Sequence, residues 1–428
     1  MSETTSRTTE TFDISVDPDY PVTPVPRSAR KTTFSLAIVL VGFTMFTPTM
    51  LAGAQVGAGF SFLPLMGVLL LGSLVLGIYV SALGWLGART NLSTAMMART
   101  SFGQGGAKLS SLLLGGTQIG WYGVSVATLA LLTGQALGWD SDASVRWLMV
   151  ASGLVMGITA YIGYKGMYVL SLVALPLMLI LGAWVTWQAF DEVGGLSPML
   201  DIEPTESMGL AVAVTIIVGT FASGGTQAPN WTRFAKTPAA GLWTCMWAFL
   251  AAQLLMLFSG AIGAIAYGEG DFVVVLFNLG LVTWGLLFLV ANIWTTNDNT
   301  AYNVGVAGAE LFNVRTRRPF VVAGVVLGTV LAVTGIYDSL VDYLVWLGIL
   351  IPPLGGVILG DHLARLRRGS GQEVTLHIPG VRWSNIAVYA LASLAAWTAN
   401  ETGFFIPPVV GMLVAFAGAV GVQALRRR

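Results

Sequence analysis

The chain has 428 residues, of which 55% are hydrophobic and 10% are charged, and its formal net charge is zero. Soluble proteins usually carry about 25% charged residues, and a mean hydropathy of +0.76 is too high for a surface that faces water. These values exclude an ordinary soluble domain and predict an all-α polytopic membrane protein, because runs of about 20 apolar residues suffice to cross a bilayer core of roughly 30 Å.

Twelve apolar runs predict twelve membrane segments. A polar tail over residues 1–32 precedes them, and we expect it to be cytoplasmic and largely disordered because it lacks apolar residues for a core. An acidic loop over 191–207 is expected to be external, and a basic loop over 361–383 cytoplasmic. The segments are expected near 33–58, 62–86, 109–137, 146–163, 166–190, 208–231, 239–267, 272–312, 319–336, 338–360, 384–400 and 404–425.

Basic residues predict the orientation, since Lys and Arg accumulate in cytoplasmic loops. If the count of twelve is right, 20 of the 21 basic residues fall on one side, and only Arg146 falls on the other. The opposite side collects the acids of residues 140–142, 191–206 and 269–271. We therefore expect a multi-pass protein of the cell (inner) membrane with both termini in the cytoplasm.

Two segments contain residues that interrupt helices. Residues 42–49 include Pro48, which has no amide hydrogen to donate, and residues 219–226 include paired glycines, which favour loss of helical order. Phe46 and Phe221, one in each stretch, are 175 residues apart. Ordinary kinks would also explain these residues.

Equal spacing of the two stretches favours an inverted repeat of five helices, because an odd-numbered repeat re-enters the membrane from the opposite side. The two repeats would span residues 33–190 and 208–360. Residues 384–428 would then add two further helices and a basic C-terminus.

Polar side chains recur on one face of the eighth expected segment at i, i+3, i+4, i+7 and i+11. Polar groups at membrane depth normally face a cavity or the bundle interior. Threonine hydroxyls on such a face can coordinate a hard cation or can bond back to backbone carbonyls, and the pattern leaves both possibilities open. The residues are Asn292, Thr295, Thr296, Asn299 and Asn303.

The third expected segment places Gln118 and Trp121 three residues apart on one face, with small residues beside them. No phosphate-binding loop, paired intramembrane acids or metal-spaced Cys and His set stands out. Asp298 is the one acid expected well inside the membrane, and His362 and His377 both fall in the basic loop. This composition argues against a membrane enzyme and against an ATP-driven pump.

Four segments make the chain resemble the nucleobase–cation symporter family, also called the purine/cytosine permease family, and within it the cytosine permeases. They occur in the family's order across nearly the whole chain. The segments are Pro24–Lys31, Leu112–Trp121, Asn292–Asn299 and Ile351–Ile358.

The resemblance implies a leucine-transporter-like fold of five plus five helices with two C-terminal helices, and a base held between two aromatic rings. The substrate-binding residues that it implies are Trp121, Phe221, Gln118, Ser223, Asn297 and Phe46. It also implies a sodium ion held by backbone carbonyls and two hydroxyls. Those residues are Gly42, Met45, Asn292, Thr295 and Thr296.

The function so implied is sodium-coupled import of a nucleobase, most simply cytosine, by alternating access. The alternatives are sodium-coupled or proton-coupled import of another base or heterocycle, such as a purine, a hydroxymethylpyrimidine, hydantoin or allantoin. A channel would conduct passively without saturable exchange. Sodium serves as the coupling ion, and we expect no other cofactor, no nucleic-acid polymer and no obligate protein partner beyond the surrounding lipid bilayer.

The orientation can be tested with Ser197→Cys. Because residues 191–207 are expected outside, the new thiol should react with an impermeant thiol reagent in intact cells. The parent chain sets the background, since its single thiol, Cys245, lies in an apolar run. Reaction only after the cells are permeabilised would show that the orientation is wrong.

Overall fold

The computed structural model describes residues 17–139, 141–201, 203–367 and 380–426. Within these ranges the chain is helical and contains no β-strand beyond one isolated bridge between Lys31 and Ala235. The helices are α1 (Thr33–Thr44), α2 (Thr47–Ala58), α3 (Phe62–Thr90), α4 (Thr94–Leu137), α5 (Asp142–Ile162), α6 (Tyr164–Glu192), α7 (Leu196–Leu200), α8 (Leu210–Thr226), α9 (Pro229–Thr232), α10 (Pro238–Met246), a π-helical turn (Trp247–Ala252), α11 (Gln253–Tyr267), α12 (Phe272–Asn278), α13 (Val282–Phe312), α14 (Arg318–Val333), α15 (Leu340–Leu366), α16 (Trp383–Thr402) and α17 (Pro407–Leu425).

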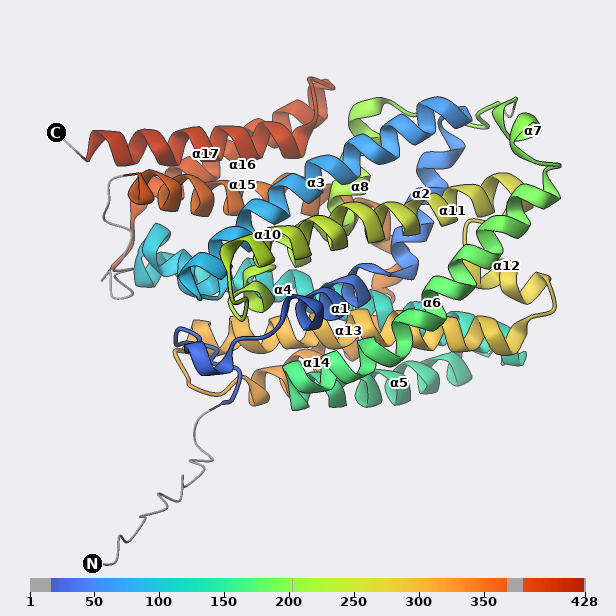
Figure 1. Ribbon diagram of the computed structural model, residues 1–428, viewed down its shortest axis with the longest axis horizontal. Helices are drawn as coiled ribbons and strands as arrows, with labels where there is room; N and C mark the ends of the chain where they lie inside the picture. Colours follow the sequence, from blue (N-terminus) through green and yellow to red (C-terminus); the bar gives the residue numbers. More distant parts are fainter. Residues whose placement is uncertain (1–16, 140, 202, 368–379, 427–428) are drawn as a thin grey trace, which may run out of the picture.

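Most of the long helices run along one direction, so the bundle has two ends (Figure 1). Residues 17–32 and the last turn of α17 lie at the left of Figure 1, and α7 lies at the right. Helices α16 and α17 pack beside α15 on one flank, while α5 and α14 pack together on the opposite flank.

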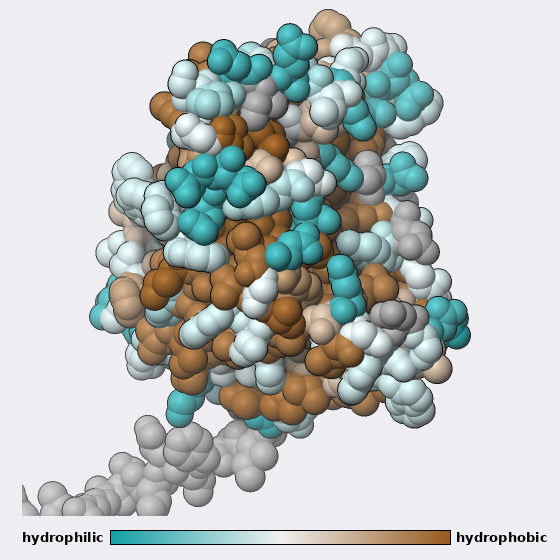
Figure 2. Space-filling model, turned by 90° about the vertical axis from the view of Figure 1, so that its right-hand side faces the viewer, coloured by the Kyte–Doolittle hydropathy of each residue, from teal (hydrophilic) through white to brown (hydrophobic). Residues whose placement is uncertain are grey.

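Charged residues separate between the two ends. We call the left end the basic end, defined by Arg30, Arg99, Arg233, Arg317 and Arg365. Asn91 and Asp19 link Arg30, Arg233 and Arg317, while Arg99 donates to Asn313 and Arg365 donates to the Thr100 carbonyl. The right end, which carries the acids of residues 191–206, is called the acidic end. Figure 2 looks onto the acidic end and shows hydrophilic side chains spread among apolar ones.

Seven helices of the described chain are long and apolar enough to cross a membrane, and the bent pair of α1 and α2 makes an eighth. The other expected segments fall on α4, α13 and α16, which carry many polar side chains, or on α14, which has only 16 residues. The all-helical, polytopic architecture is confirmed, whereas the count of twelve and the layout in two repeats stay predictions.

The first expected break is present. Helix α1 ends at Thr44 and α2 begins at Thr47, and the two helices are bent by 55°. Met45 and Phe46 between them have extended backbones. Pro48 lies in the first turn of α2, where its missing N–H leaves no helical acceptor unpaired.

The second expected break is not present within residues 219–226, and Leu210–Thr232 forms a single candidate span. Residues 219–226, including the paired glycines, are helical to the end of α8, and the chain turns only between α8 and α9. The glycines permit close packing instead. A Cβ on Gly219 would lie 2.3 Å from the carbonyl oxygen of Leu344, and one on Gly224 would lie 2.6 Å from the Phe43 ring. The prediction that these glycines interrupt the helix is therefore wrong.

Helix ends differ from the expected boundaries at two other places. The expected segment 272–312 consists of α12 and α13, separated by a turn. The basic loop expected over 361–383 begins late, because α15 continues to Leu366. His362 therefore lies in a helix and is buried, with its ring nitrogens 2.8 Å from Thr100 Oγ1 and 2.9 Å from a backbone carbonyl. His377 lies outside the described residues.

Residues 17–31 form a segment that crosses the basic end, which we call the N-terminal strap. Asp19 accepts a hydrogen bond from the Arg317 guanidinium at 2.9 Å and another from the backbone N–H of Tyr164 at 3.0 Å. Asp17 accepts from the backbone N–H of Arg317 at 3.0 Å. Arg233 donates to the strap carbonyls of Asp19 and Tyr20 at 2.8 and 2.7 Å.

The expectation that residues 1–32 are largely disordered is therefore wrong for residues 17–32. Their acids are held by arginines more than 200 residues away, and such pairing leaves no local signal in the sequence. Gly163 makes the contact possible, because it has a φ of 100° and a Cβ there would lie 2.0 Å from the Arg317 guanidinium.

Asp19→Asn tests the strap. The substitution keeps the size of the side chain but leaves the fully buried Arg317 with less compensating charge, which we expect to cost about 3 kcal/mol. The apparent melting temperature of the purified protein should fall by several degrees. Asp191→Asn removes an exposed charge instead and should change it little. Equal melting temperatures for the two variants would contradict a stabilising role for the strap.

Candidate functional site

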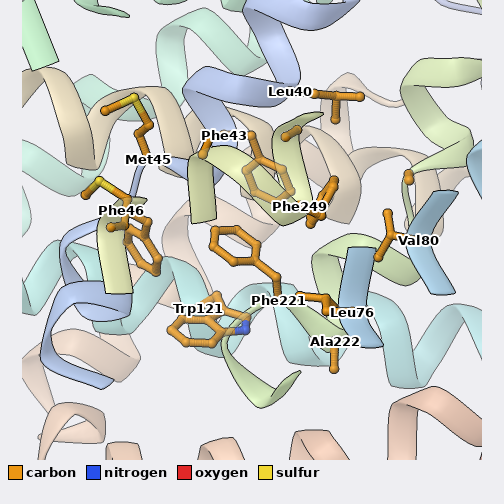
Figure 3. Close-up of a cluster of buried hydrophobic side chains, with 14 of the residues drawn as sticks. Leu40, Phe43, Met45, Phe46, Leu76, Val80, Trp121, Phe221, Ala222 and Phe249 are labelled. Atoms are coloured by element: carbon orange, nitrogen blue, oxygen red, sulfur yellow. The ribbon is translucent and has the colours of Figure 1, made fainter. Parts of the chain in front are cut away.

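Aromatic rings from three parts of the chain meet near the break between α1 and α2. Phe46, at the break itself, lies 5.5 Å from the Trp121 ring of α4 and 6.1 Å from the Phe221 ring of α8, measured between ring centroids. Both contacts are edge-to-face, and all three side chains are at least 95% buried. Figure 3 shows these rings within a larger apolar cluster that includes Phe43 and Phe249. The break thus places Phe46 in contact with both rings expected to hold a base.

These rings surround a cavity of about 10 Å³, which has room for about one water molecule. A flat heterocycle therefore needs the rings of Phe46, Trp121 and Phe221 to move apart before it can enter. Four substrate residues expected from the sequence line this cavity, together with residues that the sequence analysis did not select. The lining residues are Phe43, Phe46, Gln118, Trp121, Thr220, Phe221, Gly224, Thr296 and Thr300.

One wall of the site carries hydrogen-bonding groups. Gln118 Nε2 donates to Ser223 Oγ at 2.9 Å, which joins α4 to α8. Ser223 Oγ also contacts the hydroxyl of Thr117. The structure therefore brings five of the six predicted substrate residues together.

Asn297 is the exception. Its amide nitrogen lies 3.8 Å from the sulfur of Met156 on α5, and it does not line the cavity. The reason is helical spacing: Thr296 and Thr300 face the cavity, and the next position turns about 100° away from that face. A direct contact between Asn297 and a substrate remains a prediction.

The predicted ion-binding residues meet where α1 ends beside α13. The last carbonyls of a helix have no partner within it, so the end of α1 at Thr44 exposes oxygen atoms around Gly42 and Met45. Thr296 Oγ1 approaches one of these oxygens, the Phe43 carbonyl, at 3.1 Å, and it lies 3.2 Å from the Asn292 carbonyl. A hydroxyl of α13 therefore already reaches the broken end of α1.

Two further contacts hold this junction. Asn292 Oδ1 accepts from both the backbone N–H and the hydroxyl of Thr47, at 2.6 and 2.8 Å, which secures the start of α2. Thr295 Oγ1 lies 3.1 Å from the Asn292 carbonyl. Asn292, Thr295 and Thr296 thus place carbonyl and hydroxyl oxygens beside the Phe43 carbonyl, and such an oxygen-rich donor set fits a hard cation.

Buried acidic side chains lie on α13 and α15. Asp298 is fully buried, with Oδ1 accepting from the Asn299 side chain at 2.9 Å. Glu310 and Asp361 are also buried, and each is paired with an arginine, Arg99 and Arg365 respectively. Glu310 and Asp361 belong to the basic end through Arg99 and Arg365, so the expectation that Asp298 is the one acid well inside the membrane stays a prediction.

Several residues at the site were missed. The cavity is also lined by Phe43, Thr220 and Thr300. None of these three residues lies in the four segments that carry the family resemblance. Asn303 was recognised as part of a polar face of α13, but not as a neighbour of Gln118, whose Oε1 lies 3.5 Å from its amide nitrogen. The sequence held one signal for this position: Asn303 follows Thr296 by seven residues, which places both side chains on the same face of a helix.

A family described as permeases for cytosine/purines, uracil, thiamine and allantoin matches residues 24–421 of the chain. The cytosine permease of Escherichia coli strain K12 is 37% identical over 412 residues, which covers 96% of this chain and 95% of that protein. The allantoin permease of Bacillus subtilis is 23% identical and covers 92% of this chain and 90% of its own length.

Solved structures share the fold. Mhp1, a nucleobase-cation-symport-1 family transporter in a closed conformation with bromovinylhydantoin bound, superposes with a TM-score of 0.81 at 18% identity, covering 94% of both chains. A Na⁺-coupled sialic acid symporter in a substrate-bound outward-open state has a TM-score of 0.65 at 12% identity, covering 96% of this chain and 93% of its own. At these identities the likeness establishes the fold alone.

We call the rings of Phe46, Trp121 and Phe221 the aromatic cage. Substitutions of Trp121 test whether this cage holds a base. If the ring face holds a base, Trp121→Ala should abolish measurable cytosine binding, and Trp121→Phe should retain part of it. Trp147→Ala removes an indole that is 74% exposed and should bind normally. Binding to purified protein can be followed by calorimetry. Normal affinity in a folded Trp121→Ala variant would exclude this cavity as the binding site.

Proposed function

Because this chain belongs to the family of permeases for cytosine/purines, uracil, thiamine and allantoin, we propose that it imports cytosine in symport with sodium. It is a helical nucleobase transporter of the cell membrane and not an enzyme. The single observation that carries the finer proposal is the junction at Met45 and Phe46. There, one helix break places an aromatic ring in the cavity and backbone oxygens beside the hydroxyl of Thr296.

The aromatic cage supports a planar substrate. Stacking of a base on an aromatic side chain contributes roughly 1–3 kcal/mol, and Trp121 and Phe221 can offer faces once Phe46 moves away from them. Cytosine is uncharged and carries both donors and acceptors on its edge. The amide of Gln118 can match such groups, and the E. coli relatives at 37% identity are cytosine permeases.

Sodium coupling is supported by the position of the oxygen atoms. In this proposal Gly42 and Met45 would contribute carbonyls from the end of α1, while Asn292, Thr295 and Thr296 would contribute a carbonyl and two hydroxyls from α13. An ion bound between them would tie α1 to α13. Since Phe46 directly follows Met45, the same ion would stabilise the aromatic cage around its substrate.

Two alternatives rest on specific observations. The 23% identity with an allantoin permease favours import of another heterocycle, such as allantoin, hydantoin, a purine or a hydroxymethylpyrimidine. The carboxyl group of Asp298 favours proton coupling, because it is fully buried on α13 next to Asn297, where it could carry a proton. We propose sodium, because Asp298 does not line the cavity.

We further propose that the basic end faces the cytoplasm, so that both termini are cytoplasmic and the acidic end is external. The gathering of Arg30, Arg99, Arg233, Arg317 and Arg365 at one end supports this orientation through the preference of basic residues for the cytoplasmic side. It also places the N-terminal strap across the cytoplasmic end of the proposed pathway.

Sodium should tighten cytosine binding, and cytosine should tighten sodium binding by the same factor, because coupling between two binding sites is reciprocal. The test compares cytosine affinity in sodium and in choline at constant pH and ionic strength. Thr296→Ala removes a proposed ligand and should reduce the difference. Thr334→Ala removes an exposed hydroxyl and should preserve it. Unchanged affinity without sodium, together with uptake driven by a pH gradient alone, would favour the proton-coupled alternative.

A further inference from the structure

Buried amide side chains form a continuous line between the basic end of α4 and the cavity. The backbone N–H of Thr94 donates to Asn230 Oδ1 at 3.2 Å, and Asn230 Nδ2 donates to Asn303 Oδ1 at 2.8 Å. Asn303 Nδ2 in turn lies 3.5 Å from Gln118 Oε1, and Gln118 Nε2 donates to Ser223 at 2.9 Å. This amide chain links α4, α9, α13 and α8.

The direction of every bond in the amide chain follows from its first member. A backbone N–H can only donate, so the atom of Asn230 that faces Thr94 must be the oxygen. Its NH₂ group then faces Asn303, which must present its own oxygen. By the same step, the NH₂ group of Asn303 faces the oxygen of Gln118. A reversed amide at any link would place two donors against each other.

Water cannot relax this constraint, because each member of the chain is at most 2% exposed. A buried donor or acceptor left without a partner costs roughly 1–3 kcal/mol. Reversing Gln118 alone would set its NH₂ group against that of Asn303. The orientation of Gln118 is therefore fixed by residues that do not line the cavity.

The last hydrogen bonds of the amide chain determine which donors and acceptors the cavity wall presents to a ligand. Thr117 donates its hydroxyl hydrogen to the Leu114 carbonyl at 2.9 Å, so in its contact with Ser223 it is the acceptor. Ser223 therefore gives its hydrogen to Thr117 and accepts from Gln118. An amide nitrogen carries two hydrogens, and Ser223 takes one of those on Gln118. The second is available to a ligand.

The threonine hydroxyls around the cavity have their hydrogens engaged. The hydroxyls of Thr220, Thr296 and Thr300 all lie within hydrogen-bonding distance of backbone carbonyl oxygens, to which they donate. They can accept from a ligand but do not readily donate to one. Gln118 thus supplies the amide donor of the cavity wall.

We propose that Asn303 and Asn230 are positioning residues that hold Gln118 as a hydrogen-bond donor, so that this transporter selects heterocycles presenting an acceptor atom to it. The proposal rests on the proposed function, since it takes the cavity to be the cytosine site. Cytosine carries two neighbouring acceptors, the C2 carbonyl oxygen and the unprotonated N3. A ring with C–H or N–H at the corresponding position leaves the Gln118 donor unpaired.

The experiment measures how much each acceptor contributes to binding. Purified full-length protein is titrated with cytosine, with 4-aminopyrimidine, which lacks the C2 carbonyl, and with 3-deazacytosine, which has C–H in place of N3. For the wild type, at least one analogue should bind about tenfold more weakly than cytosine, the size expected for a lost hydrogen bond at a buried site. Equal binding of all three ligands would overturn the donor assignment.

Asn303→Leu then tests the positioning role. Leucine has nearly the shape of asparagine but cannot donate, so the link to Asn303 is lost. The Gln118 amide can then turn over when the rotatable hydroxyls of Thr117 and Ser223 reverse with it, so that Ser223 donates to the Gln118 oxygen. The tenfold difference in affinity between cytosine and the weaker analogue, which we call the penalty, should shrink to about threefold or less. Cytosine itself should bind more weakly than to the wild type. Asn385→Leu is the matched control, because it removes another fully buried amide, on α16, that does not contact the chain. It should retain the wild-type penalty.

A purely structural role for Asn303 would weaken all three ligands by the same factor and leave the penalty at its wild-type value, which would overturn the proposal. If Asn303→Leu does not fold, Asn230→Ser removes the constraint one link farther from the cavity and should reduce the same penalty. Failure of the proposed function has a different signature: neither the wild type nor Asn385→Leu would bind cytosine.

Discussion

The interruption between α1 and α2 is the constraint on which the site depends. A backbone inside a bilayer must find hydrogen-bonding partners within the protein, and two extended residues cannot satisfy each other. Helix α13 supplies those partners: Asn292 binds the start of α2 through Thr47, and Thr296 binds the end of α1 through the Phe43 carbonyl. The polar face of α13 is therefore required by the break as much as by any ligand.

This arrangement couples two sites through a single short segment. Met45 lies beside the oxygen atoms suited to a cation, and Phe46 contacts the rings of Trp121 and Phe221. A change that draws α1 toward α13 must also move Phe46. Since the closed cavity admits about one water molecule, movement of Phe46 is also the simplest way to make room for a base. In the proposed mechanism, ion binding and substrate entry would therefore involve the same few backbone torsions.

The basic end shows how charges are accommodated in an apolar chain. Arg233 and Arg317 are fully buried, yet their guanidinium groups bind carbonyls and carboxylates of the N-terminal strap. Removing one partner from such a cluster leaves an uncompensated charge, so the strap is part of the folded bundle. The same arginines join the ends of α5, α9 and α13. Closure of this end therefore depends on a segment that precedes the first helix.

The sequence by itself determined what depends on composition and on short spacings. Apolar runs predicted a polytopic helical protein, Pro48 predicted the break in the first segment, and the family motifs selected Gln118, Trp121 and Phe221, which the fold brings together. These features are local, because each is written in residues close to one another in the chain. The motifs could not supply the distances between those residues.

Only the tertiary structure decided the features that arise between distant segments. The glycines of residues 219–226 are helical because neighbouring helices approach them closely, although in isolation they favour a break. Asp19 is ordered by an arginine almost 300 residues away. The orientation of the Gln118 amide follows from Thr94 through two asparagines on other helices. Hydrogen bonds and close contacts of this kind depend on which side chains meet in space, and no spacing along the chain encodes that.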